Sequence, residues 1–199
     1  MSRIPRFREL ALGISQFVIA FALVPSAHAT AAEYAIDAQR TVVTFETRNL
    51  GFLRYRGSFG STSGTVKLDP QAGAGSVDIV VDARSLSADS RAMEQFMRGS
   101  GLLDVERFPR IAYAADRIEF VDGTPDRIVG ALTLLGVTRR VTLAITYNDC
   151  LLRGAAATHC TMIATATFRR SDFGMTAWRA LASDEVKLVV DATGVLVPM

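Results

Sequence analysis

Apolar and polar residues alternate along most of the chain after residue 30. Alternation with a period of two is typical of strands that bury one face. The apolar members are, in chain order, Val43 and Phe45, Val66 and Leu68, Val77 to Val81, Ile111 to Ala115, Ile128 to Leu134, Val137 to Tyr147, Met162 to Phe168, and Val186 to Val190. Turn-forming residues separate these segments, so the sequence predicts about eight antiparallel strands.

One segment follows a helical spacing instead. Between Asp89 and Gly99, four apolar residues recur three and four positions apart, namely Ala92, Met93, Phe96 and Met97. Asp89 or Ser90 can cap the first turn, and Gly99 can end the helix. The sequence therefore predicts a short helix between two parts of the sheet.

Eight antiparallel strands with one helix suit a closed barrel, because closure removes the exposed strand edges. We therefore predict an all-β fold. A barrel of this size is either filled by its own side chains or holds one slender ligand. The small inward residues (Gly64, Ala115, Gly130, Ala164 and Ala166) favour the ligand, and larger neighbours that close the gap are the alternative.

The first 29 residues have the pattern of a secretory signal peptide. Arg3, Arg6 and Arg8 precede an apolar run over residues 10–24, and the small residues Ala27 and Ala29 suit cleavage. The apolar run is about 15 residues long, whereas a membrane anchor needs about 20. The expected organisation is a signal peptide over 1–29 and one barrel domain over 30–199, exported to an oxidising compartment.

Charge and cysteine content refine this expectation. The chain has 22 Lys and Arg against 20 Asp and Glu. Without the signal peptide the numbers are equal, which argues against a nucleic-acid partner, since phosphate binding needs excess positive charge.

Two cysteines remain, Cys150 and Cys160. In an oxidising compartment they are expected to form a structural disulfide, because their spacing is not that of a redox pair and a zinc site needs more ligands.

Sequence signals of catalysis are weak. After residue 29, His159 is the only histidine, which disfavours Ser-His-Asp and Cys-His mechanisms. The glycine-rich segments 57–64 and 73–75 lack the remaining residues of phosphate-binding loops. We expect no enzyme activity, no metal and no cofactor.

Several strings resemble the YceI-like family of exported proteins. They are YAID at 34–37, TVVTF at 41–45, NLG at 49–51, RGSF at 56–59, LLDVERFP at 102–109, GALTLLGVTRRVTL at 130–143, RSDFGM at 170–175 and SDEV at 183–186. The resemblance implies a lipocalin-like antiparallel barrel, exported to the periplasm, that binds a polyisoprenoid in an apolar tunnel, for example an isoprenoid quinone or a polyprenyl phosphate or pyrophosphate. Family members commonly have histidine where this chain has Asn49, and an amide can donate a hydrogen bond to a head group but carries no charge.

The expected ligand-binding residues fall into three groups. The tunnel walls are Phe45, Tyr113, Leu132, Leu134 and Phe168; the first motif supplies Asn49 and Leu50; and the mouth is formed by Met93, Phe96, Met97, Leu102, Leu103, Phe173, Met175 and Trp178. Methionine suits such a mouth because its flexible side chain adapts to ligands of different shape.

The predicted function is non-enzymatic storage or transport of an isoprenoid lipid, with transient contact to a membrane surface. Two alternatives stay open, an enzyme acting on an isoprenoid or quinone, and a stress-related interaction module with a dry core. The sequence does not decide whether the chain forms a homodimer.

Overall fold

The computed structural model describes residues 32–49, 53–150, 158–178, 180 and 182–198. The predicted signal peptide at 1–29 lies outside these residues. The strands are β1 (Ala32–Ile36), β2 (Val42–Asn49), β3 (Leu53–Phe59), β4 (Thr62–Asp69), β5 (Ala74–Asp82), β6 (Leu86–Ala88), β7 (Arg110–Val121), β8 (Thr124–Leu134), β9 (Val137–Asn148), β10 (His159–Arg169) and β11 (Ala182–Leu196). The helices are α1 (Arg91–Arg98) and two short 3₁₀ turns, η1 (Ala83–Ser85) and η2 (Arg170–Phe173).

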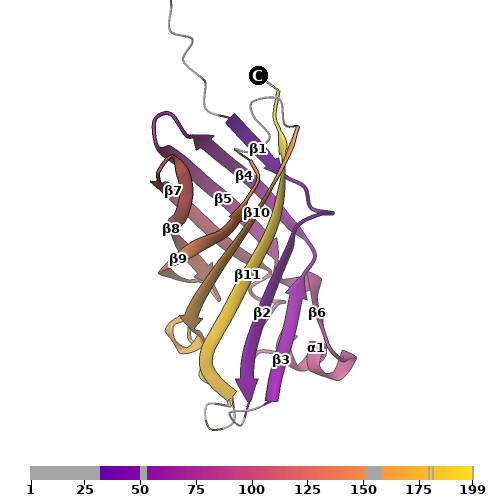
Figure 1. The fold of residues 1–199 in the computed structure, drawn as a ribbon. Helices are drawn as coiled ribbons and strands as arrows, with labels where there is room; N and C mark the ends of the chain where they lie inside the picture. The colour runs from indigo at the N-terminus through magenta and orange to yellow at the C-terminus, as the bar shows by residue number, and fades with distance from the viewer. Residues whose placement is uncertain (1–31, 50–52, 151–157, 179, 181, 199) are drawn as a thin grey trace, which may run out of the picture.

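Eight strands form a closed antiparallel ring in the order β1, β4, β5, β7, β8, β9, β10, β11, closed by the pairing of β11 with β1. The remaining strands β2, β3 and β6 extend the sheet from β11. β11 pairs with β1 near its end and with β2 along its first half, so it connects the closed ring to the extension formed by β2, β3 and β6 (Figure 1). The predicted eight-stranded antiparallel barrel with one short helix is confirmed.

Three strands escaped the period-two analysis. β1 and β6 have only five and three residues, too few to show a period. β3 does alternate, but Gly57 interrupts its apolar face. A Cβ atom at Gly57 would lie 2.5 Å from Cζ of Phe45, so the glycine is needed to let the Phe45 ring pack against the strand.

The helix α1 forms where the sequence predicted it. The Ser90 hydroxyl caps it by accepting a hydrogen bond of 3.2 Å from the Met93 N–H, and Gly99 follows its last residue. Arg98 attaches the helix to the barrel, since its Nη2 donates to the carbonyls of Arg84 and Leu86 at 3.0 and 2.7 Å. The helix thus lies beside β6 at one end of the barrel (Figure 1), which we call the α1 end.

The interior contains two groups of buried residues. The group nearest α1 includes Val43, Phe59, Val81, Leu86 and Met97. The larger group extends to the opposite end of the barrel and includes the following side chains: Tyr34, Leu68, Val77, Tyr113, Ile118, Ile128 and Met162. The interior is therefore apolar along its whole length.

The two cysteines are bonded to each other, as predicted. Cys150 and Cys160 have Cα atoms 4.5 Å apart and are both buried in the larger core group. The disulfide connects the chain that follows β9 to the start of β10. Among the described residues, no helix has the length and apolar composition needed to cross a membrane.

Candidate functional site: an apolar cavity in the barrel

A cavity of about 170 Å³ occupies the half of the barrel nearest α1. Its lining consists of Val43, Phe45, Thr47, Phe59, Ile79, Val81, Met97, Leu102, Leu103, Ile111, Ala112, Tyr113, Leu132, Leu134, Val141, Leu143, Phe168, Arg170, Met175, Val186, Leu188 and Val190. Four lining residues lie outside the strands, namely Met97 on α1, Leu102 and Leu103 in the chain after α1, and Met175 in the chain after η2, and we call them the mouth of the cavity. A cavity of about 150 Å³ lined by apolar side chains stays dry and accepts benzene, so this one has room for an apolar ligand.

Nine of the residues expected to bind the ligand line this cavity. They are Phe45, Met97, Leu102, Leu103, Tyr113, Leu132, Leu134, Phe168 and Met175. They come from separate strands and loops, and the barrel brings them together because each faces inward from its own element.

Four expected residues lie elsewhere. Phe173 is 1% exposed and packs edge-on against Phe168 at 5.3 Å, so it supports the wall from behind. Met93 packs against the core group nearest α1. Phe96 and Trp178 are 45% and 54% exposed and contact each other edge-on at 5.5 Å, outside the cavity.

The first family motif is only partly described. Asn49 is the last residue of β2, and its backbone pairs with Leu53 of β3. Leu50 lies outside the described residues.

Most of the remaining lining residues follow from the alternation even though the sequence did not single them out. Val81, Leu143, Val186 and Val190 are members of the apolar faces that predicted the strands, and the structure shows that these faces point into the cavity. Arg170 carried no such signal, because a charged residue is not expected in an apolar wall.

Arg170 is 4% exposed and holds the wall of the cavity near the mouth. Its guanidinium donates to backbone carbonyls: Nε to Ser183 at 3.0 Å, Nη1 to Met175 at 2.9 Å and to Ala177 at 2.7 Å, and Nη2 to Ala182 at 3.3 Å. Next to it, Asp184 accepts hydrogen bonds from the N–H and the hydroxyl of Ser171. These bonds fix the chain after η2 onto the start of β11 and so position Met175.

The small inward residues do not create the cavity. Ala115, Gly130, Ala164 and Ala166 are absent from its lining, because larger neighbours fill the space beside them. A Cβ at Gly130 would lie 2.7 Å from Cζ of Tyr113 and 2.8 Å from Cβ of Ala115, so this glycine accommodates the tyrosine ring. Gly64 serves the backbone, since it has a φ of +142° and a Cβ there would meet the Asp78 carbonyl at 2.0 Å.

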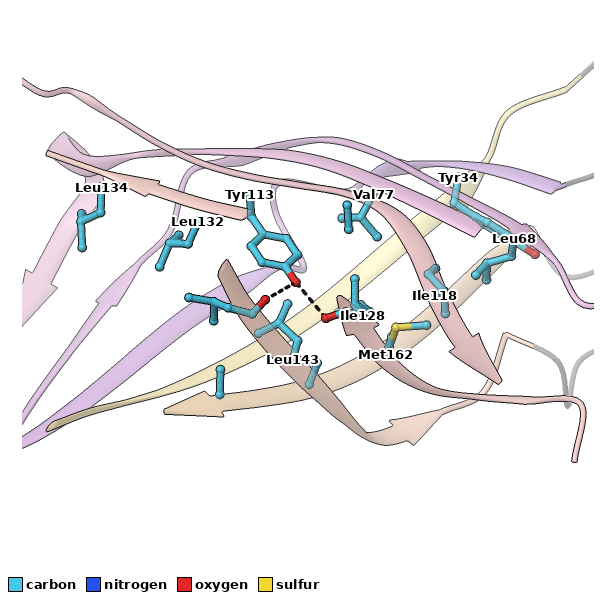
Figure 2. Close-up of a cluster of buried hydrophobic side chains, with 14 of the residues drawn as sticks. Tyr34, Leu68, Val77, Tyr113, Ile118, Ile128, Leu132, Leu134, Leu143 and Met162 are labelled. Atoms are coloured by element: carbon cyan, nitrogen blue, oxygen red, sulfur yellow. Dashed lines mark hydrogen bonds between the residues drawn. The ribbon is translucent and has the colours of Figure 1, made fainter. Parts of the chain in front are cut away.

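Tyr113 lies at the inner end of the cavity, and Figure 2 shows its ring inside the barrel. Its hydroxyl oxygen is 2.9 Å from the carbonyl oxygen of Ile128 and 2.9 Å from that of Val141. Burial raises the pKa of the phenol to about 12, because the phenolate would lose its hydration. The hydroxyl is therefore neutral and bound to the barrel backbone.

The cavity offers few groups for chemistry. Among the described residues that line it, Thr47, Tyr113 and Arg170 carry the polar side chains. His159 is exposed at the start of β10, and within the described parts of the chain no three His, Cys, Asp or Glu side chains gather as metal ligands. The arrangement suits the enclosure of an apolar molecule.

Comparison with known proteins agrees with this architecture. The profile of the YceI-like domain matches residues 34–194. The chain belongs to the YceI-like family. Curated relatives include a UPF0312 protein of Yersinia pestis (strain Pestoides F), 28% identical over 94% of this chain and 96% of the relative. Another is a UPF0312 protein of Enterobacter sp. (strain 638), 31% identical over 87% and 91%.

Solved structures share the fold of this YceI-like chain. Burkholderia cenocepacia BcnA superposes with a TM-score of 0.65 at 20% identity, over 79% of this chain and 98% of BcnA. A polyisoprenoid binding domain from Saccharophagus degradans, described as implicated in plant cell wall breakdown, gives a TM-score of 0.61 at 15% identity, over 82% and 98%. The barrel is thus a fold shared across distant sequences.

Proposed function

We propose that this protein is an exported, non-enzymatic carrier that encloses the apolar chain of an isoprenoid lipid, an isoprenoid quinone or a polyprenyl phosphate or pyrophosphate, for storage or transport. The observation that carries the proposal is the cavity, which is enclosed by aliphatic and aromatic side chains from most strands of the barrel. The structural neighbour described as a polyisoprenoid binding domain supports the same ligand class.

Burial of the apolar chain supplies the affinity. Each buried methylene contributes about 0.8 kcal/mol, so one five-carbon unit is worth roughly 3 to 4 kcal/mol before the costs of binding. Polar contacts to the head group therefore need only to orient it. Arg170 donates its hydrogen bonds to backbone carbonyls, so the lining presents little polarity to the ligand.

We also propose that the exposed aromatic pair contacts membranes during lipid exchange. Phe96 lies on α1 and Trp178 in the chain after η2, and these two parts of the molecule also supply residues of the mouth. Aromatic side chains favour the membrane interface, where one part is apolar and another is wet. The double variant F96S/W178S should transfer lipid to vesicles at a lower rate and keep its melting temperature. Unchanged transfer would show that lipid leaves elsewhere.

Export follows from the predicted signal peptide, and the disulfide supports it because disulfides persist in oxidising compartments. The mass of the intact periplasmic protein should correspond to a chain that begins at Thr30 or within two residues of it. A protein retaining residues 1–29 in the membrane would contradict a freely diffusing carrier.

The ligand itself is tested by extraction. The protein is purified without detergent from the periplasm, extracted with organic solvent, and the extract is analysed by mass spectrometry for isoprenoids. We expect a stoichiometric isoprenoid lipid. An extract without isoprenoid would favour the dry-core module. If the protein is incubated with an isoprenoid lipid and converts it to a product, the result would favour an enzyme.

A further inference from the structure

On β5, β7 and β8 the lining of the cavity ends at one rung of the barrel, whereas on β9 it continues to Leu143, which pairs with Ile128. Ile79, Tyr113 and Leu132 are paired side by side on β5, β7 and β8, and all three line the cavity. One rung further from α1, Val77 pairs with Ala115, and neither lines it. On β5 and on β7, the lining of the cavity therefore ends within two residues.

The other half of the barrel is packed with side chains. Tyr34, Leu68, Val77 and Ile118 lie on the far side of Tyr113 from Leu132 and Leu134, as Figure 2 shows. Tyr34 is 6% exposed, Leu68 2% and Ile118 2%. These side chains belong to the larger core group, and none of them lines the cavity.

The ring of Tyr113 is held in place at both ends. Its backbone belongs to β7, and its hydroxyl reaches the carbonyls of Ile128 on β8 and Val141 on β9. Gly130 provides the space beside the ring, since any side chain there would collide with it. The ring is therefore a fixed part of the barrel, unlike the methionines and leucines of the mouth.

From this geometry we infer that Tyr113 is the end wall of the isoprenoid site and sets how many isoprene units the barrel encloses. The inference rests on the proposed function. The polar lining residues Thr47, near the end of β2, and Arg170, at the start of η2 directly after β10, lie toward the mouth, so the lipid enters with its apolar tail first. The last isoprene unit then stops against the ring, and units beyond the capacity of the cavity stay outside.

This arrangement predicts that the affinity reaches a plateau as the isoprenoid chain becomes longer. Each unit enclosed by the cavity should tighten binding by about tenfold or more, whereas each unit outside it should change affinity less than about twofold. The six ring carbons and the hydroxyl of tyrosine fill about the space of one five-carbon unit. Y113A should therefore move the plateau to a chain one unit longer.

The experiment measures dissociation constants for isoprenoid alcohols of two to six units, beginning with geraniol, farnesol and geranylgeraniol, by displacement of the fluorescent probe N-phenyl-1-naphthylamine. The lipid-stripped full mature protein is compared with Y113A. Y113F, which keeps the ring, should retain the plateau of the parent.

A second variant, which should shorten the cavity instead of lengthening it, keeps the test valid even if Y113A does not fold. Ile79 lines the cavity on the same rung as Tyr113, so I79F should bring the end wall closer to the mouth and move the plateau to a shorter chain. Circular dichroism shows which variants are folded.

The outcomes separate the two proposals. Failure of the parent to bind any of the alcohols would overturn the proposed function. An affinity that keeps rising with every unit up to six, or a plateau that is the same in the parent, Y113A and I79F, would overturn the role of Tyr113 while the carrier function stands.

Discussion

Substitution of Leu132 distinguishes a ligand cavity from an ordinary core. Leu132 is 6% exposed, lines the cavity and pairs with Tyr113. In a filled core, an added indole would cost about 1 to 3 kcal/mol through overpacking. In this barrel, Leu132→Trp places the indole in the space of about 170 Å³. We therefore expect a loss below about 1 kcal/mol, and a protein that no longer holds lipid.

Leu132→Ala changes the same site in the other direction. Leucine-to-alanine substitutions in cores cost about 2 to 5 kcal/mol, and the cost grows with the size of the new void. Here one face of Leu132 already borders a cavity, so fewer contacts are lost and the expected cost is about 2 to 3 kcal/mol. In a protein of this size that lowers Tm by about 4 to 12 °C.

The assay pairs thermal unfolding of the lipid-stripped proteins with the isoprenoid content after expression. Leu68, which is 2% exposed and lies in the packed half, supplies the matched control. Leu68→Trp should destabilise the barrel far more than Leu132→Trp. The reasoning is refuted if Leu132→Trp carries as much lipid as the parent while losing as much stability as Leu68→Trp.

Three further substitutions test other parts of the structure. The double variant C150S/C160S removes the link that closes an 11-residue loop, so it should lose about 3 kcal/mol in urea unfolding and keep its lipid content. Loss of lipid from the folded variant would contradict a purely structural role. Gly130→Ala should cost about 1 to 3 kcal/mol, because the new Cβ meets the Ala114 carbonyl as well as Tyr113, whereas the control G60A, with open space around it, should be neutral. Arg170→Met leaves several carbonyls without their donor and should cost roughly 3 to 5 kcal/mol, measured by urea unfolding; a neutral result would show that water replaces the guanidinium.

The barrel was predictable because each strand buries one face. Val77 and Val81 on β5, or Ile128 and Leu132 on β8, carry the period of two in their own sequence, and closure of eight such strands follows from the need to protect their edges. The helix was predictable for the same local reason, since Ser90 and Gly99 mark its two ends.

Residues outside the alternation could not be placed in this way. Phe96, Phe173 and Trp178 are similar aromatic residues in loops or on a short helix, and nothing local distinguishes the buried Phe173 from the two exposed ones. The positions of Phe173 and Trp178 depend on how η2 and the chain after it fold over the barrel, which Arg170 fixes through hydrogen bonds to backbone carbonyls 13 and 7 residues away. Such contacts leave no periodic trace in the sequence.

The small inward residues give a more general reason why a binding site is harder to predict than a fold. Gly130 on β8 and Ala115 on β7 suggested an open interior. The ring of Tyr113, which lies one rung away on β7, fills the space that they leave. The cavity lies instead beside bulky residues such as Phe45 and Phe168, which line a wider part of the barrel where β2 and β3 join the sheet. Volume inside a barrel depends on pairs of residues from different strands, so a small side chain makes a cavity only if no neighbour reaches across it. The strand register, which the alternation alone does not define, decides which neighbours can do so.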